Sequence, residues 1–466
     1  MFDLSTSLTI LLLVCLLCAI AFEFVNGFHD TANAVATVIY TNSLKPNVAV
    51  VWSGLCNFAG VFAGGIAVAM GIVNLLPVEA LVDSNTMHSV AMVLALLLSA
   101  IIWNLGTWYV GLPASSSHAL IGSILGVGIA YSFLPGGSAV AINWTKAQEI
   151  GLSLLISPFF GFACAIFLMF FFKRVIKNDF IFKEASQEKE PPMWVRAVLI
   201  TTCSLVSFFH GSNDGQKGVG LVMLILIGIV PAYFAIDNTV ELQNTKTSIE
   251  HIHLLVSRAD TLTLSAKEVK THKEIIAKAI EAEALINTNI DASTLPKDQR
   301  FAVRSNIVKI TKGCEKLVKG GNLSLSKNDI TDLTKSIAST RKATDYAPKW
   351  VILMISLSLG LGTMIGWKRI VKTIGEKIGK QHMSYAQGAS AEIVAAVTIG
   401  LSTSFGLPVS TTHVLSSGIA GSMVAKKGLK NLQPKTIKNI LLAWVLTLPV
   451  TMLLSGLLFL LFRAIL

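Results

Sequence analysis

The sequence predicts an all-α polytopic membrane protein built from two related halves. Only 14% of its 466 residues are charged and 53% are hydrophobic, whereas about a quarter of the residues of a soluble chain are charged. Several uncharged apolar runs reach the roughly 18–20 residues that span a bilayer as a helix. The clearest of these runs are Leu4–Phe22, Val90–Val110 and Leu441–Leu461.

The net charge of the chain is +11, from 38 Lys and Arg against 27 Asp and Glu. In a membrane protein such a surplus faces the cytoplasmic membrane surface, so it does not indicate nucleic-acid binding. The first apolar run follows Asp3 and has no Lys or Arg before it. We therefore expect this run to remain as a helix instead of being cleaved as a signal peptide.

One long stretch departs from the apolar composition. Ile236–Tyr346 has no spanning run, yet it holds 17 of the 38 basic and 14 of the 27 acidic residues. Segments such as Ala266–Leu285 place apolar residues at helical spacing between mixed charges. The sequence therefore predicts a polar helical insert here.

Two motifs occur twice in the chain. Gly111–His118 reads Gly-Leu-Pro-Ala-Ser-Ser-Ser-His, and Gly406–His413 reads Gly-Leu-Pro-Val-Ser-Thr-Thr-His. Asn26–Asn33 matches His210–Lys217 more weakly, with an aspartate at the same position in each. The interval from this aspartate to the motif histidine is 88 residues in one half and 199 in the other, and the difference of 111 is the length of the insert. The chain is therefore two repeats, of which the second carries the insert.

The distribution of basic residues in loops predicts the topology. Lys173–Arg196 holds six of them, and Lys368–Lys380 and Lys426–Lys438 hold five each. Placing these loops inside gives five crossings per half, both termini outside and the insert outside. An odd number of crossings inverts the second repeat relative to the first, which is the architecture of many secondary transporters with discontinuous helices.

The expected boundaries follow from these patterns. They are 1–172 for the first membrane repeat, 173–193 for a basic cytoplasmic linker, 194–235 for the start of the second repeat, 236–346 for the insert and 347–466 for the remainder of the second repeat.

The first candidate site residues are acids within apolar sequence. Asp30 and Asp214 lie at matching positions, and intramembrane acids mark ion or substrate paths. Neighbouring glycines permit a broken helix whose free backbone groups coordinate an ion. The alternative is an acid at a helix end that reaches water. Glu392 is a further candidate for coupling, whereas Glu23 fits either a site acid or an interfacial one.

The Ser/Thr-rich motifs suit an oxyanion. Pro113 and Pro408 favour a helix start, and the hydroxyl residues after them, Ser115, Ser116 and Ser117 or Ser410, Thr411 and Thr412, are capping types. Two such helix starts converging near the midplane would offer N–H groups, dipole ends and hydroxyl donors. The alternative for each residue alone is hydrogen bonding between helices.

Other polar residues have more than one interpretation. His29 beside Asp30 is suited to relay protons near neutral pH. Lys217 is expected to pair with an acid, and the alternative is that it holds substrate charge. For His118 and His413 we favour packing over direct substrate contact. No group of residues has the spacing of a dedicated protein metal site.

The paired signatures Asn26–Ala34 and His210–Gly218, together with the Gly-Leu-Pro motifs, resemble the PiT family of inorganic phosphate transporters. The chain is most similar to the bacterial PitA-type branch of low-affinity phosphate:proton symporters. The resemblance covers Ala21–Leu461 without the insert. It implies phosphate and cation symport, a homodimer, a multi-pass protein of the bacterial inner membrane, and no enzymatic activity or cofactor.

The resemblance also implies roles for single residues. Asp30, Asn33, Asn213 and Asp214 would lie at the phosphate and coupling-ion sites, the two hydroxyl triplets would bind phosphate, and Glu392 would be required for coupling. Three departures from the sodium-coupled pattern favour protons: His29 in place of Asn, Gln216-Lys217-Gly218 in place of Ala-Asn-Ala, and Asn57 in place of Glu. The resemblance further implies that phosphate can travel as a neutral complex with a divalent metal.

Several alternatives stay open at this point. Within the transporter class they are sodium coupling and another tetrahedral oxyanion such as sulfate. An intramembrane hydrolase would use His118 or His413 with Asp30, but the sequence lacks a nucleophile motif and a cofactor loop. A sensor with the insert as its input domain leaves the duplicated acids unexplained.

Overall fold

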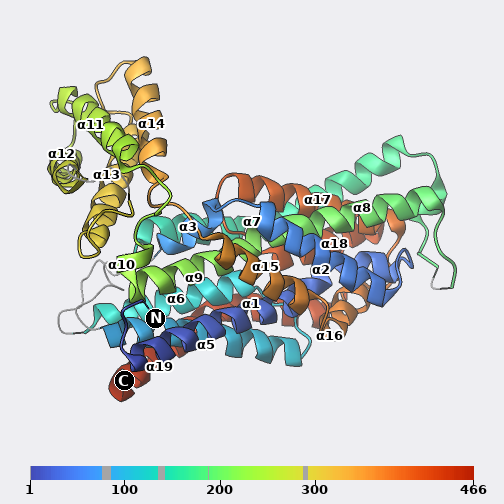
Figure 1. The fold of residues 1–466 in the computed structure, drawn as a ribbon. Coiled ribbons are helices and arrows are strands. Elements are labelled where there is room, and N and C mark those ends of the chain that lie inside the picture. Colours follow the sequence, from blue (N-terminus) through green and yellow to red (C-terminus); the bar gives the residue numbers. More distant parts are fainter. Residues whose placement is uncertain (1, 76–85, 135–141, 187, 287–291) are drawn as a thin grey trace. The chain divides into compact units, whose positions relative to one another are not determined.

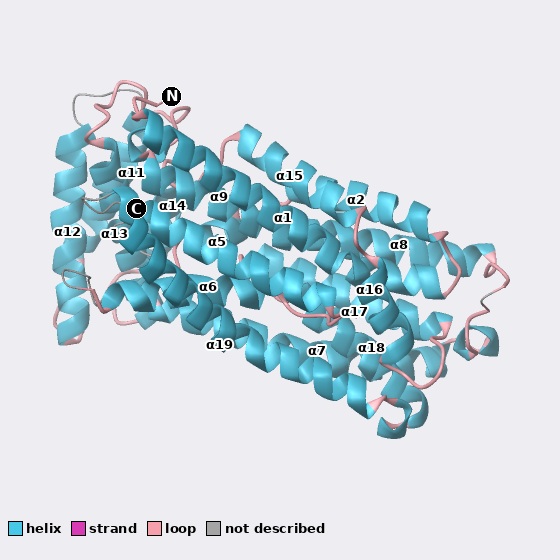
Figure 2. Ribbon diagram, turned by 90° about the horizontal axis from the view of Figure 1, so that it is seen from below, coloured by secondary structure: helices cyan, strands magenta, loops and turns pink. Residues whose placement is uncertain are grey.

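The computed structural model describes residues 2–75, 86–134, 142–186, 188–286 and 292–466. It is helical, with only isolated β-bridges between the described segments, as Figure 2 shows. The chain divides into two compact units. One consists of Ser5–Ile225 and Pro348–Leu466 and contains both sets of motifs; the other consists of Met1–Leu4 and Leu226–Ala347. The all-α class predicted from the sequence is confirmed.

The first half of the motif-containing unit consists of the helices listed here (Figure 1). They are α1 (Thr6–Tyr40), α2 (Pro46–Ala63), α3 (Ala67–Val73), α5 (Thr86–Tyr109), α6 (Ser116–Ser132) and α7 (Trp144–Val175).

The second half has a similar order of helices. It comprises α8 (Met193–His210), a π-helical turn (Gly211–Gly215), α9 (Gln216–Ile229), α15 (Lys349–Thr363), α16 (Lys368–Lys372) with a π-helical turn (Thr373–Lys377), α17 (Tyr385–Ser404), α18 (Thr411–Lys427) and α19 (Pro434–Ile465). Between α9 and α15 lie α10 (Pro231–Phe234) and the helices of the other unit.

The two halves interlock through their last helices. Helix α6 packs on α19, and α18 packs on α7, so the helix that follows each Gly-Leu-Pro motif lies against the last helix of the other half. Both α6 and α18 have 17 residues, and both α7 and α19 have 32. This exchange brings the two motifs into one part of the unit.

Among the described helices, six are long and apolar enough to cross a membrane, and a seventh results if the bent pair Lys349–Thr363 and Lys368–Lys377 is one span. The sequence predicts about ten crossings. Helices α6 and α18 are not among these long helices. Each begins at its motif, within the protein interior, and its 17 residues are too few for a full span. The membrane-spanning class therefore holds, while the count of ten stays a prediction.

The second unit contains α11 (Leu242–Arg258), α12 (Ala266–Ile286), α13 (Arg300–Gly320) and α14 (Lys327–Arg341). Their apolar faces form one core that includes Ile249, Ile275 and Ile307. Buried Arg304 donates to the carbonyl oxygens of Ala235 and Thr344, at 3.0 and 2.7 Å. This side chain holds together the two chain segments that enter and leave the helical region.

Candidate functional site

The two Gly-Leu-Pro motifs end one helix and start another by the same local geometry. Gly111 and Gly406 have φ of +70° and +65°, a left-handed conformation that glycine adopts without steric cost. The Leu112 N–H reaches the Thr107 carbonyl, and the Leu407 N–H reaches that of Ser402, each at 2.9 Å. These are the bonds of a Schellman cap. The chain is thereby turned out of α5 and α17 toward the hydroxyl residues.

The next helix in each half begins with a side-chain cap, as predicted. The Ser115 hydroxyl accepts from the His118 N–H at 3.2 Å, and the Ser410 hydroxyl accepts from the His413 N–H at 3.1 Å. The prolines lie two residues before these caps and not in the first helical turn. Their role is therefore to hold the extended entry segment, because proline cannot continue the preceding helix.

The two motifs lie against each other. The Ser117 hydroxyl of the first motif donates to the Val409 carbonyl of the second at 3.0 Å. The imidazole rings of His118 and His413 lie 4.5 Å apart, and His413 stacks on Trp444 at 3.9 Å. The predicted convergence of the two helix starts is present in the structure.

Asp30 of α1 is buried among neutral hydroxyl groups and imidazoles. Ser116 donates to one of its oxygens at 2.9 Å, and Thr412 of the other half donates to the second oxygen at 2.7 Å. His29 contacts the same second oxygen through Nδ1 at 3.1 Å. The carboxylate is therefore satisfied by hydrogen bonds from both halves of the unit, and none of its partners among the described residues is a Lys or Arg.

Asp214, in the π-helical turn, has a cationic partner. The Lys217 ammonium lies 2.5 Å from one oxygen of Asp214 and also donates to Ser117 at 2.5 Å and to the Val409 carbonyl at 3.0 Å. Thr411 lies 3.5 Å from the other oxygen. The pairing role favoured for Lys217 is the arrangement seen, and this lysine also ties Asp214 to the first motif.

His210 lies between the two acids, a position that the sequence did not assign to it. Its Nε2 is 3.8 Å from an oxygen of Asp30 and 3.4 Å from an oxygen of Asp214, while its Nδ1 lies 3.0 Å from the Asn57 amide oxygen. The sequence feature that could have identified it is its position: His210 is the first residue of the second signature, as Asn26 is of the first. Sequence spacing could not reveal the cluster because its members come from both halves.

Asp30, His210 and Asp214 offer ligand atoms that all lie within 4.8 Å of one another. Two carboxylate oxygens and an imidazole nitrogen suit a divalent transition metal better than Ca²⁺, which prefers oxygen ligands alone. The cluster is compatible with a bound divalent cation. Lys217 would compete with such a cation for Asp214.

The two asparagines expected at the phosphate site differ in what can be described. Asn213 donates to Thr403 at 3.0 Å and to the Leu407 carbonyl at 3.1 Å, and it accepts from the Val409 N–H at 3.2 Å. These bonds brace the second motif. The side chain of Asn33 lies outside the described residues.

Glu392 of α17 is buried in a separate place. The hydroxyls of Thr37 and Thr202 donate to its two oxygens, and the carboxyl is fully buried. Thr37 follows Asp30 by two turns of α1, or roughly 10 Å along the helix axis. The structure thus sets this acid apart from the cluster around Asp30 but on the same side of α1.

The first signature does not contain the helix break that its glycine permits. Helix α1 runs through it without interruption, whereas in the second half the helix turns π-helical at Gly211–Gly215. The reason is close helix packing, since a Cβ on Gly27 would lie 2.5 Å from the Leu359 carbonyl oxygen. Helices instead end and restart at the two Gly-Leu-Pro motifs, and α15 and α16 form a bent pair.

Comparisons with known proteins agree with this architecture. The model of the phosphate transporter family matches residues 26–455. The low-affinity inorganic phosphate transporter PitA of Escherichia coli (strain K12) is 43% identical, over 97% of this chain and 96% of its own. The corresponding transporter of Buchnera aphidicola subsp. Acyrthosiphon pisum (strain APS) is 44% identical, over 98% and 97%.

The chain belongs to the phosphate transporter family. A solved structure titled the sodium-dependent phosphate transporter is similar in fold, with a TM-score of 0.55, 18% identity, and coverage of 98% of this chain and 100% of the other. The family resemblance inferred from the motifs is confirmed, and so is the interpretation that the protein is a transporter and not an enzyme.

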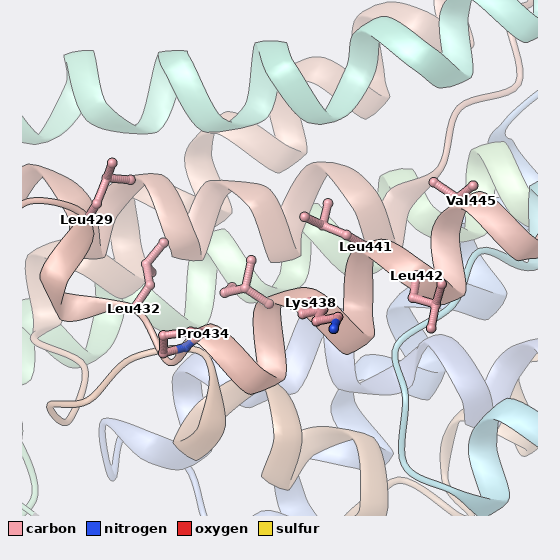
Figure 3. Close-up of a pocket in the computed structure, with 8 residues that line it drawn as sticks. Leu429, Leu432, Pro434, Lys438, Leu441, Leu442 and Val445 are labelled. Carbon is pink, nitrogen blue, oxygen red and sulfur yellow. The ribbon is translucent and has the colours of Figure 1, made fainter.

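In this family member a groove on the outer side of α19 lies apart from the acid cluster. Figure 3 shows its lining, which is apolar except for one lysine: Leu429, Leu432, Pro434, Ile437, Lys438, Leu441, Leu442 and Val445. More than half of the Leu441, Leu442 and Val445 side-chain area is exposed. Such a surface suits contact with lipid chains.

Proposed function

We propose that this protein imports inorganic phosphate across the bacterial inner membrane by symport with a cation. One observation carries the proposal: two helix starts, one from each half, aim hydroxyl groups at two buried acids. Family membership and the names of the relatives, which are low-affinity inorganic phosphate transporters, support phosphate as the substrate.

Phosphate would bind between the two helix starts. Helix N-termini and hydroxyl donors favour an oxyanion, and the donors available are those of Ser115, Ser116, Ser117, Ser410, Thr411 and Thr412. Ser116 and Thr412, which now bond Asp30, would turn toward phosphate oxygens. Asn213 would act by holding the second motif in place, and Asn33 stays a predicted contact.

A cation must accompany phosphate into this site. Phosphate would lie near the carboxylates of Asp30 and Asp214, and like charges in a poorly hydrated interior repel strongly. A proton or metal ion bound there would remove the repulsion. His29 on Asp30 and Lys217 on Asp214 supply protonatable groups, so we favour protons over sodium. A divalent metal held by the Asp30, His210 and Asp214 cluster would be cargo with phosphate.

The proposal includes alternating access by two inverted repeats. It is supported by the similar order of helices in the two halves and by the crossed packing of α6 on α19 and α18 on α7. In this arrangement one set of helices would rock around the fixed site. The outside location of both termini and of the insert, and the homodimer, stay predictions.

Uptake into proteoliposomes tests both the substrate and the coupling ion. We expect accumulation of radiolabelled phosphate when a pH gradient is imposed with the outside acidic, and greater uptake when a divalent cation is present. Uptake that follows a sodium gradient and ignores pH would overturn proton coupling and leave phosphate transport standing.

The same vesicles distinguish phosphate from other tetrahedral oxyanions. Arsenate, which titrates as phosphate does, should compete for uptake. Sulfate has no proton to share at neutral pH and should compete poorly. Equal competition by sulfate and arsenate would instead indicate a general oxyanion transporter.

A further inference from the structure

Glu23 is a buried acid of α1 that the sequence left between a site role and an interfacial one. Its side chain is fully buried. One oxygen accepts from the Asn26 amide at 3.1 Å, and the other has no hydrogen-bond partner in the described part of the chain. The interfacial interpretation is therefore wrong, because an interfacial acid would reach water.

The surroundings of Glu23 differ from those of the other buried acids. Asp30 and Glu392 each receive hydroxyl donors on both oxygens, and Asp214 has Lys217. Such donors stabilise an ionised carboxylate. Glu23 has only one donor, and burying a charged oxygen without a partner is costly. The environment of Glu23 therefore suits a bound proton better than those of the two signature acids, Asp30 and Asp214.

Glu23 also lies against the second signature. A Cβ on Gly218 would come within 2.6 Å of the unpartnered oxygen of Glu23, so only glycine leaves room for the carboxyl there. Gly218 directly follows Lys217, the partner of Asp214. The acid of the first half is therefore packed on the helix that begins at the cation site of the second half.

Glu23 belongs to a polar stripe along α1. Glu23, Asn26, Asp30 and Thr37 are spaced by three, four and seven residues, which places them on one helix face. Asn26 donates to Glu23, and its amide oxygen has no described partner. The stripe covers roughly 21 Å at 1.5 Å per residue, and at its far end Thr37 donates to Glu392.

We propose that Glu23 carries the coupling proton. In each cycle its carboxylate takes a proton from water on the outer side and, in the other state of the transporter, releases it to water that enters the site around Asp30 from the inner side. Asp30 and Asp214 then remain ionised and hold the cation, while the hydroxyls of the two motifs hold phosphate. This inference rests on the proposed proton coupling. It assigns the transfer of the proton to Glu23 instead of to Asp30 and Asp214.

Other titratable groups act on Glu23 as well. Those near it are Asp214, Lys217 and His210 of the second signature. From α2 and α15, which pack against α1, the buried polar side chains are neutral and include Asn57 and Thr363, bonded to each other at 2.9 Å. Protonation of Glu23 would thus respond to cation binding at Asp214 through charge.

The test compares Glu23→Gln with the wild-type protein in two assays. The first is phosphate accumulation driven by a pH gradient, with proton entry followed by an internal pH dye. The second is phosphate exchange at equal concentration and pH on both sides, which needs binding and turnover but no net proton movement. We expect Glu23→Gln to lose accumulation and proton entry, to the level of protein-free vesicles, and to keep exchange.

Two further variants make the result decisive. Glu149→Gln removes a half-exposed acid of α7 that pairs with Lys146 and should behave as wild type. Glu23→Asp keeps a carboxyl and should retain accumulation with a shifted pH profile. Accumulation by Glu23→Gln at the wild-type level, or loss of exchange together with accumulation, would overturn the inference. Wild-type uptake that ignores the pH gradient would instead overturn the proposed coupling itself.

Discussion

The two signature acids occupy matching positions in the repeats but have different partners. Asp30 is held by the hydroxyls of Ser116 and Thr412 and by an imidazole. Asp214 is held by the ammonium group of Lys217. The second acid is therefore paired with an ammonium group, whereas the described partners of the first are hydroxyls and imidazoles, among them His210 at 3.8 Å.

This difference predicts different roles for the acids of the two halves. A buried ion pair fixes a position and has little need of an added cation, whereas a buried anion surrounded by neutral donors retains affinity for one. If phosphate enters together with a cation, as proposed above, we therefore expect that cation to bind first at Asp30. His210, which lies near both acids, would sense when that cation is present.

The largest predicted loss of stability comes from removing one member of the ion pair between Asp214 and Lys217. Asp214→Asn leaves the Lys217 ammonium buried without its acid, which costs about 3–5 kcal/mol of stability. Asp30→Asn removes an anion whose partners are mostly neutral and should cost only about 1–3 kcal/mol. Both variants should lose phosphate uptake. Thermal unfolding in detergent measures the difference in stability between them.

A double variant sharpens this prediction. Asp214→Asn combined with Lys217→Gln removes both charges, so most of the lost stability should return while uptake stays absent. If the double variant is as unstable as Asp214→Asn, the ion pair is not what distinguishes the two halves. Normal uptake by Asp30→Asn would show that this acid is structural.

A smaller effect is expected from the hydroxyls that face each acid. Ser116 bonds Asp30 at 2.9 Å, whereas Thr411, its counterpart in the repeat, lies 3.5 Å from Asp214, at the limit of a hydrogen bond. Ser116→Ala should lower the free energy of unfolding by about 1.5–3 kcal/mol, since the bond is to a charged group. Thr411→Val should change the same free energy little.

The control for this pair is Ser132→Ala at the end of α6, where the hydroxyl donates to the Ile129 carbonyl of its own helix. Equal losses of stability in Ser116→Ala and Thr411→Val would show that the two acids depend alike on their motif hydroxyls. The surroundings of the two acids would then differ in the presence of Lys217 but not in their dependence on the motif hydroxyls.

The sequence predicted the features that repeat or that change composition. The helical class and the capped helix starts at Ser115 and Ser410 follow from local patterns, and the structure has them. The insert at 236–346 follows from the change in composition, and its bounds stay a prediction. The position of His210 between two acids did not follow, because the cluster forms only when distant segments pack. The same holds for the unbroken helix at Gly27, which depends on α15 at the crossing.

The smallest predicted effect concerns the two motif histidines. His118 contacts the Ser115 hydroxyl through Nδ1 at 2.8 Å, so His118→Phe should lose about 1 kcal/mol of stability. His413 has a ring nitrogen without a described partner and stacks on Trp444, and His413→Phe keeps the stacking at almost no cost. Phosphate uptake should persist in both variants, because packing is the role favoured for these rings. A folded His413→Phe protein that no longer transports phosphate would instead assign this imidazole to the substrate, in the half whose acid is already balanced by Lys217.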